Sequence, residues 1–476
     1  MALFRIQSLP AALLLTAALN VAWPAVGRAA TDQPPAPELA SDTSDTLNSD
    51  WRPAYDAHDW DKSLAVLAAI IPKVPAESYD AAYVYRAEAL LYLQNKNNQP
   101  LGLQCLEKSL AIDDRKHYFP QKDVQEILYN ISQVSYGEAV TAKDPKIKRP
   151  LFERATQTLE RWLEHADLRT LNQDNFYYVA VVYFTLGQGT ELGPDQKPDK
   201  AMTEKALNWL NKGLRSVTHP RDSFYQLKVA ALYQLDRYKE TAECIEFQLK
   251  QKPDNKNNWQ ELAVLYQQLA NSAEEKKDKE NAFRYYVRLI VTYDRAQKLG
   301  FLTTPKDNYN VVAYYQDIDQ YSKACELLEK GLKGETIEST PQNWTTLGAW
   351  YQLIHRNDKS VQAFITAAEL FPTNAEIEYQ LATVYLGVPD ESKAFEHIKA
   401  CIAKGGTEKP HVGWLFYAYT AMDLQRFDEA LKGAQEAAVA AKKINATDAV
   451  KQAEKMEEAI KASVLDLENR RQQTQR

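Results

Sequence analysis

Along most of the chain, apolar residues recur three and four positions apart, and groups of them recur about every 34 residues. The clearest group spans the 29 residues from Trp344 to Pro372. It places bulky or small residues at fixed positions and ends in a proline: Trp344, Leu347, Gly348, Tyr351, Ser360, Phe364, Ala367 and Pro372. This pattern predicts two antiparallel helices that pack through one apolar face each.

Each position in this group has a packing reason. Gly348 and Ser360 are small where the two helices must approach closely, and Phe364 fills the space between them. Pro372 cannot continue a helix, so the second helix ends before it and the next unit begins. Tyr385 follows Tyr351 by 34 residues, and the same frame recurs on both sides of this unit.

These positions resemble the tetratricopeptide (TPR) signature, in which helix-turn-helix repeats stack side by side. The resemblance implies an all-α, right-handed superhelical solenoid of about nine or ten repeats with a C-terminal capping helix. We expect degenerate repeats over residues 51–220, clear repeats over 221–441, and a cap and tail over 442–476. The predicted cap carries its apolar residues at helical spacing: Ala453, Met456, Ile460, Val464 and Leu467.

Two repeats are longer than the others by roughly 16 residues, since Tyr183 to Tyr233 and Tyr266 to Gln316 each span 50. The extra stretches are Gly187–Lys200 and a segment centred on 272–280. We expect both to be loops within their repeats. Either they extend a docking surface or they are tolerated surface insertions.

The N-terminus has the layout of an export signal. Arg5 precedes an apolar stretch from Leu9 to about Trp23, and small residues end at Ala29 and Ala30. We predict a signal peptide over residues 1–30, cleaved near Ala29 or Ala30, and hence a periplasmic protein with no membrane span after cleavage. An uncleaved membrane anchor is the alternative. Residues 31–50, acidic and rich in Pro and Ser, are expected to be a disordered linker.

Charge argues against nucleic-acid binding. The chain carries 57 Lys and Arg against 64 Asp and Glu, a net charge of −7. Without residues 1–30, which contribute Arg5 and Arg28, the net charge is −9. Nucleic-acid binders normally present a basic face to the phosphates.

No catalytic, cofactor or metal constellation is evident, so we expect no enzyme activity. None of the seven histidines stands in a metal-ligand spacing. Gly187, Gly189 and Gly193 resemble a phosphate loop only superficially, because they follow a predicted helix and lack the Lys-Ser/Thr pair. The four cysteines are predicted to be buried free thiols rather than disulfides, because they fall in different repeats: Cys105, Cys244, Cys325 and Cys401.

A partner would bind the concave surface, which the first helix of each repeat lines in TPR proteins. The positions that flank the core residues predict this surface: Tyr177, Phe184, Phe224, Gln260, Gln267, Asn310, Tyr314, Gln352, Tyr379, Leu386, Leu415 and Tyr419. The set is aromatic and amide-rich, which suits a peptide held by stacking and hydrogen bonds. It has almost no Lys or Arg, and so departs from the pattern of Lys, Arg and Asn with which some TPR proteins clamp a C-terminal carboxylate. Alternatively, several of these tyrosines only pack between repeats.

The region from about Asp222 to Ala438 also resembles one bacterial family. The residues that carry the likeness are Lys298–Thr303, the helix over Tyr309–Tyr315, and Ala324–Leu332. They are similar to exported TPR proteins associated with TonB/ExbB/ExbD systems of Gram-negative bacteria. The resemblance implies an accessory that docks on the TonB complex or an outer-membrane transporter. The alternatives are an outer-membrane or polysaccharide-export assembly factor, or an enzyme framed by helical repeats.

Overall fold

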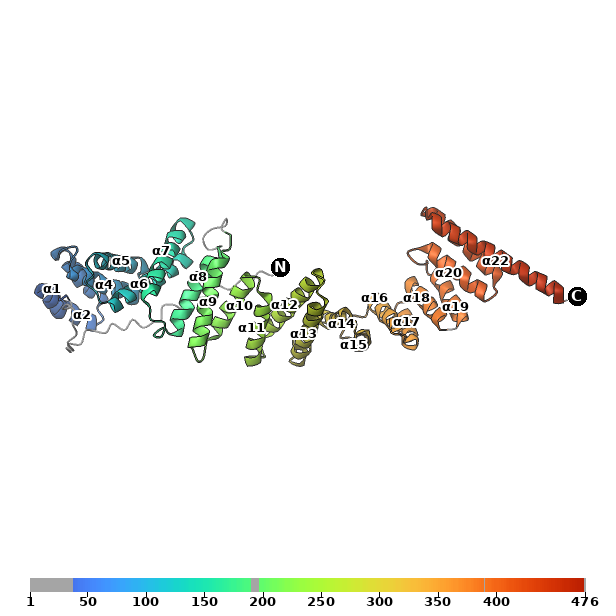
Figure 1. Cartoon of the computed structure of the whole chain (residues 1–476), viewed down its shortest axis with the longest axis horizontal. Helices are drawn as coiled ribbons and strands as arrows, with labels where there is room; N and C mark the ends of the chain where they lie inside the picture. Colours follow the sequence, from blue (N-terminus) through green and yellow to red (C-terminus); the bar gives the residue numbers. More distant parts are fainter. Residues whose placement is uncertain (1–36, 190–196, 389, 475–476) are drawn as a thin grey trace. The chain divides into compact units, whose positions relative to one another are not determined.

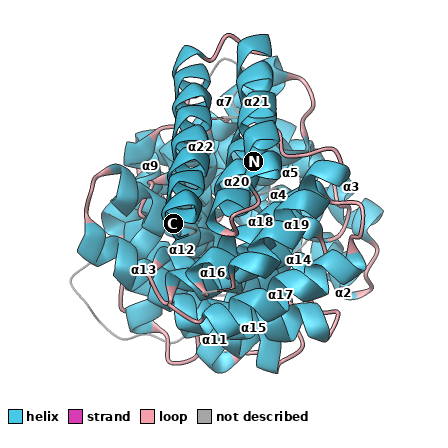
Figure 2. Cartoon of the chain, turned by 90° about the vertical axis from the view of Figure 1, so that its right-hand side faces the viewer, coloured by secondary structure: helices cyan, strands magenta, loops and turns pink. Residues whose placement is uncertain are grey.

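The computed structural model describes residues 37–189, 197–388 and 390–474. These residues form helices joined by turns, with no strand among them (Figure 1, Figure 2). The chain divides into two compact units, residues 1–245 and 246–476. Successive antiparallel helix pairs make up each unit, which confirms the all-α solenoid of TPR-like repeats. The predicted signal peptide lies outside the described residues.

In its described residues the first unit holds the pairs α4–α5, α6–α7 and α8–α9, preceded by short helices that pack on α3 and followed by α10. The division between the units falls within α11 (Tyr238–Gln251). The helices before α11 are α1 (Ser41–Thr46), η2 (Leu47–Trp51), α2 (Arg52–Asp56), α3 (Trp60–Ile70), η3 (Ile71–Lys73), α4 (Tyr79–Gln94), α5 (Gln99–Lys116), α6 (Gln121–Thr141), α7 (Pro145–His165), α8 (Gln173–Gln188), α9 (Lys200–Ser216) and α10 (Asp222–Gln234).

The second unit holds five pairs, each a first helix packed on the helix that follows it. Its helices are α12 (Lys256–Glu275), α13 (Lys279–Lys298), α14 (Pro305–Asp317), α15 (Tyr321–Lys333), α16 (Pro341–Leu353), α17 (Asn357–Leu370), α18 (Ala375–Gly387), α19 (Glu391–Ala403), α20 (Pro410–Asp423), α21 (Phe427–Lys443) and, after the last pair, α22 (Thr447–Thr474). In α22, Ala453 and Ile460 are buried and pack on the last pair.

The pair α16–α17 shows why the spacing predicts the fold. Gly348 lies against Phe364 so closely that a Cβ atom there would be 2.5 Å from ring carbons of Phe364. The Ser360 hydroxyl donates a hydrogen bond to the Gly348 carbonyl at 2.8 Å. Ser360 and Phe364 are fully buried. Small residues on both helices therefore let the two backbones approach, as the sequence predicted.

The turn inside each pair is also encoded locally. Among the described residues, eleven that are not glycine have a positive φ, and several stand between the first and second helix of a pair: Asp236, Lys277, Asp319, His355 and Gln425. The residue that follows each of them donates its N–H to a carbonyl five residues back, as Arg356 does to Tyr351 at 2.8 Å. This hydrogen bond satisfies a carbonyl at the end of the first helix.

Two expectations were wrong. Residues 41–50 are helical rather than a disordered linker, because Leu47 and Trp51 are buried on the first pair and repay the cost of ordering α1 and η2. The stretch 272–280 is not a loop either, since the extra residues lengthen α12 and α13 and leave only a short turn. Of the other predicted loop, residues 190–196 lie outside the described residues.

None of the helices that the structure describes is long and apolar enough to cross a bilayer.

Candidate partner-binding surface

The junctions between successive pairs repeat one arrangement, which we call the junction triad. A tyrosine on a first helix contacts a glutamate on the preceding second helix, and a Lys or Arg on the following second helix pairs with that glutamate. Three junctions have it: Tyr183 with Glu160 and Lys205, Tyr266 with Glu246 and Arg288, and Tyr351 with Glu329 and Lys359. Second helices are thereby joined to one another by ion pairs.

The triad at Tyr351 has the shortest hydrogen bond. The Tyr351 hydroxyl donates to Glu329 Oε2 at 2.5 Å, and Lys359 Nζ lies 3.3 Å from the same oxygen. Lys359 also lies 5.2 Å from the centre of the Tyr351 ring. Burial favours the neutral acid at Glu329, but hydrogen bonds from Lys333 and Tyr351 outweigh it and hold the pKa at about 2. The carboxylate therefore stays ionised and fixes the junction.

One junction has the reverse polarity. The tyrosine is Tyr417, whose hydroxyl lies 3.4 Å from Glu429 on the following second helix. The cation is Lys399 on the preceding second helix, 3.8 Å from Glu429. The charged side chains of these junctions are thus engaged within the protein, and the first helices are the candidate binding surface.

The structure separates the twelve predicted binding residues into three groups. Four are exposed: Gln260, Gln267, Leu386 and Tyr419. Five are half-buried: Tyr177, Asn310, Gln352, Tyr379 and Leu415. Three are buried: Phe184, Phe224 and Tyr314. Tyr177, Phe184 and Phe224 belong to the first unit and the other nine to the second.

The buried three were wrongly predicted as partner contacts. Phe224 is fully buried, in contact with Gly213 and 5.4 Å from the ring of Tyr177. The Tyr314 ring lies 5.6 Å from that of Tyr293, and the two residues also share a hydrogen bond. Phe184 is 5% exposed. Neighbouring pairs cover all three side chains, so for these three the alternative of packing between repeats holds.

Aromatic and apolar side chains gather on α18 and α20. Tyr379 and Phe416 make an edge-on ring contact at 5.6 Å between the two helices. Leu386 is 38% exposed and Tyr419 is 42% exposed. Leu415 packs partly on the alanine cluster under α22. The structure thus brings together Tyr379 and an aromatic residue that we did not predict, Phe416, although its position three residues before Tyr419 on α20 pointed to the same face.

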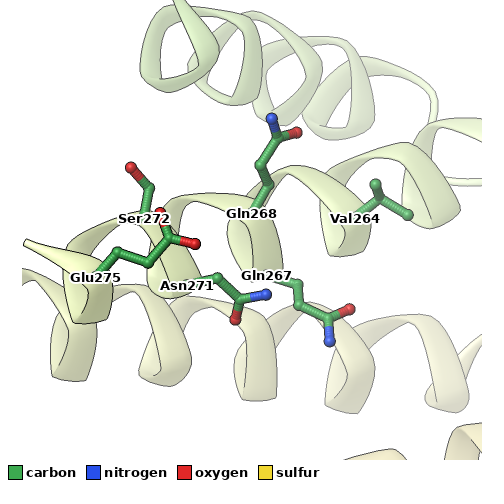
Figure 3. Close-up of a pocket in the computed structure, with 6 residues that line it drawn as sticks. All are labelled: Val264, Gln267, Gln268, Asn271, Ser272 and Glu275. Atoms are coloured by element: carbon green, nitrogen blue, oxygen red, sulfur yellow. The ribbon is translucent and has the colours of Figure 1, made fainter. Parts of the chain in front are cut away.

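A shallow pocket of about 500 Å³ lies along one face of α12. Amide, hydroxyl, carboxylate and apolar groups line it: Val264, Gln267, Gln268, Asn271, Ser272 and Glu275. Figure 3 shows Gln268 at one edge of this face and Gln267 and Asn271 at the opposite edge. Hydrogen-bonding amides therefore border the pocket on two sides. Val264 is 63% exposed. Sequence reasoning found Gln267 alone among the six, although their spacing of three and four residues is that of one helix face.

The four cysteines and Gly187 occupy packed positions in the described structure. Among the described residues, no cluster of His, Cys, Asp and Glu has the arrangement of a metal site. The four cysteines are buried free thiols, and burial raises the pKa of Cys105 to about 12 and of the other three to about 11. A Cβ atom on Gly187 would lie 2.3 Å from the Thr203 hydroxyl, so this glycine permits close packing. Gly193 lies outside the described residues.

Comparisons with known proteins add distant likenesses. No family model and no curated protein matches the chain. The crystal structure of MamA is 19% identical, covers 38% of this chain and 92% of its own, and has a TM-score of 0.31. A chain of the APC/C hetero-tetramer Cut9–Hcn1 is 12% identical, covers 87% of this chain and 90% of its own, and has a TM-score of 0.25. A chain of Naa15/Naa10 bound to HypK is 13% identical, covers 88% of this chain and 76% of its own, and has a TM-score of 0.25. At these values, function must be inferred from the residues.

Proposed function

We propose that the chain is an exported scaffold that binds other proteins through the first helices of its second unit. The observation that carries this proposal is the set of exposed apolar, aromatic and amide side chains on α12, α18 and α20. Val264, Leu386 and Tyr419 are among the exposed large apolar side chains of this unit. Exposed aromatic and aliphatic side chains that neighbour one another are typical anchors of protein interfaces.

The proposal extends to the compartment and the partner. The signal-like N-terminus supports export to the periplasm, and the resemblance to TonB-associated TPR proteins supports a role as an accessory of a TonB-dependent transport system. Assembly of outer-membrane proteins or export of polysaccharide would use the same fold in the same compartment. The identity of the captured partner therefore separates these roles.

Three substitutions on the first helices test the surface: Tyr379→Ala, Leu386→Ala and Tyr419→Ala together. Tyr314 is left out because it is buried. The full chain is immobilised and exposed to an extract of the native cell envelope, and captured proteins are identified by mass spectrometry. We expect wild type to retain TonB-complex or transporter components, and the variant to lose them.

The matched control removes exposed apolar side chains of the second helices: Ile365→Ala, Leu370→Ala and Val439→Ala, whose side chains are 37%, 51% and 48% exposed. This control should capture the same partners as wild type. If both variants capture them equally well, the first-helix surface is not the binding surface. Capture of outer-membrane assembly or polysaccharide-export components instead would favour the alternative role.

A further inference from the structure

The two helix layers of the second unit differ in charge. The first helices, α12, α14, α16, α18 and α20, carry eight Asp and Glu but only two Lys and no Arg. The second helices, α13, α15, α17, α19 and α21, carry fourteen Lys and Arg and eleven Asp and Glu. Both lysines of the first helices, Lys256 and Lys306, stand in the first turn of their helix. The body of the first-helix layer is therefore purely anionic.

Among the described residues, six of the eleven acids of the second helices form ion pairs within the protein. Glu280 pairs with Arg284 at 2.6 Å, and Glu326 pairs with Lys323 at 2.9 Å. On the first helices, seven of the eight carboxylates form no ion pair with any Lys, Arg or His that the structure describes, the exception being Glu378. The seven include Glu261, Glu275, Asp317, Glu376 and Asp423, which are exposed or half-buried. The charge of this layer is thus left without a counter-charge from the protein itself.

At two of these carboxylates, Glu261 and Asp317, burial destabilises the ionised form, and no ion pair compensates. Burial raises the pKa of Glu261, and no cation offsets it. Burial also raises the pKa of Asp317, and the nearby Glu274 carboxylate on α12 raises it further. A cation brought to these groups by a ligand would relieve both the desolvation and the repulsion.

The carboxylates stand among groups that suit a long cationic side chain. Glu261, Gln268 and Glu275 are seven residues apart on α12, so they share one line along the helix, with exposed Val264 beside them. On α18, burial raises the pKa of the Tyr379 hydroxyl, and the nearby Glu376 carboxylate raises it further. On α20, Asp423 follows exposed Tyr419 by four residues, about one helical turn. Lys and Arg need carboxylate or amide oxygens for the charge and apolar surface for the stem, and they stack well on aromatic rings.

We propose that the first-helix surface of the second unit binds an extended polypeptide segment bearing several Lys or Arg residues. This inference rests on the scaffold function proposed above and adds the chemistry of the partner. Each pair of this unit packs on the next through α13–α14, α15–α16, α17–α18 and α19–α20. With about 10 Å for each step from one pair to the next, the distance from α12 to α20 is roughly 40 Å. An extended chain reaches that far with about twelve residues. A single compact cation or a polyamine would reach only one or two of the carboxylates.

The test uses three fluorescein-labelled dodecapeptides, (Lys-Gly-Ala)4, (Gln-Gly-Ala)4 and (Glu-Gly-Ala)4, and the full chain. Fluorescence anisotropy measures binding at low and moderate salt.

One variant neutralises the first helices: Glu261→Gln, Glu275→Gln, Glu376→Gln and Asp423→Asn. Its control makes the same change in net charge on exposed acids of the second helices that form no ion pair in the described structure: Glu369→Gln, Glu396→Gln, Asp428→Asn and Glu436→Gln. Circular dichroism confirms that both variants fold.

We expect the lysine peptide alone to bind, with affinity falling at least about tenfold in the first-helix variant and less than about twofold in the control. Added salt should weaken binding to wild type and change little for the first-helix variant. Equal binding of the lysine and glutamine peptides, equal loss in both variants, or no binding at all would overturn the inference. If the envelope partner is lost with Tyr379, Leu386 and Tyr419 replaced but retained after neutralisation, the scaffold function stands and the cationic partner does not.

Discussion

At the scale of single residues, Glu329 shows how a junction depends on one ionised group. Its pKa is held at about 2, below its usual value of 4.5, so its contribution to stability is complete above pH 5 and is lost as the pH falls towards 2. The carboxylate is 25% exposed, and we expect a contribution of about 2 kcal/mol at neutral pH.

Urea unfolding of wild type and Glu329→Gln measures this contribution. The free energy of unfolding should be lower for Glu329→Gln at pH 7, and the difference should shrink steadily from pH 5 to pH 3. The control is Glu326→Gln on the same helix, where an exposed pair with Lys323 is expected to contribute less than about 0.5 kcal/mol. A difference that is constant with pH would show that Glu329 acts through packing rather than charge.

Gly348 sets the distance between α16 and α17. Gly348→Ala would place its Cβ atom against the Phe364 ring, and we expect a loss of about 1–3 kcal/mol in the free energy of unfolding. Gly387→Ala is the matched control, because the nearest neighbour of that Cβ atom is Asn357 Nδ2 at 3.7 Å. Chemical denaturation should show a loss for the first variant and none for the second; two neutral variants would mean that Phe364 moves aside freely.

At the scale of helices and turns, the left-handed turn residues are a place to gain stability. Gln425 has φ of 59° between α20 and α21, where a non-glycine residue costs roughly 1–2 kcal/mol. Gln425→Gly should raise the free energy of unfolding by about 0.5–1 kcal/mol, because the relief of strain exceeds the added freedom of the unfolded chain. Gln425→Ala keeps the strain and should give no gain. Thermal unfolding of the three proteins decides between these outcomes.

The helices also show where sequence reasoning succeeds and where it fails. Trp344, Gly348 and Phe364 act within one pair, so their spacing alone predicts their packing. The burial of Tyr314 depends instead on Tyr286 and Tyr293, which lie on α13 in the preceding pair. Leu47 and Trp51 are buried because they pack against residues of α3 and α4, which follow them in the chain. The composition of residues 31–50 alone predicted disorder there. Contacts within a pair were therefore predictable, whereas exposure at a junction was not.

At the scale of the whole molecule, a stack of pairs that contact mainly their neighbours should respond locally to damage. Phe364→Ala removes a fully buried side chain from the pair α16–α17 and is expected to cost about 3–5 kcal/mol there. Hydrogen exchange should accelerate most in α15–α18 and much less in α4–α9 of the other unit. Uniform acceleration throughout the chain would show that the two units unfold as one cooperative body.

The reversed junction at Lys399 and Glu429 has a consequence for how repeats recognise their neighbours. If the hairpin carrying Glu429 docked on the helix carrying Glu329, two carboxylates would meet where one carboxylate and one ammonium now pair. Similar hairpins are prone to exchange places within or between chains as they fold. Opposite polarity at this one interface penalises such an exchange, so the sign of a surface charge helps to fix the serial order of otherwise similar hairpins.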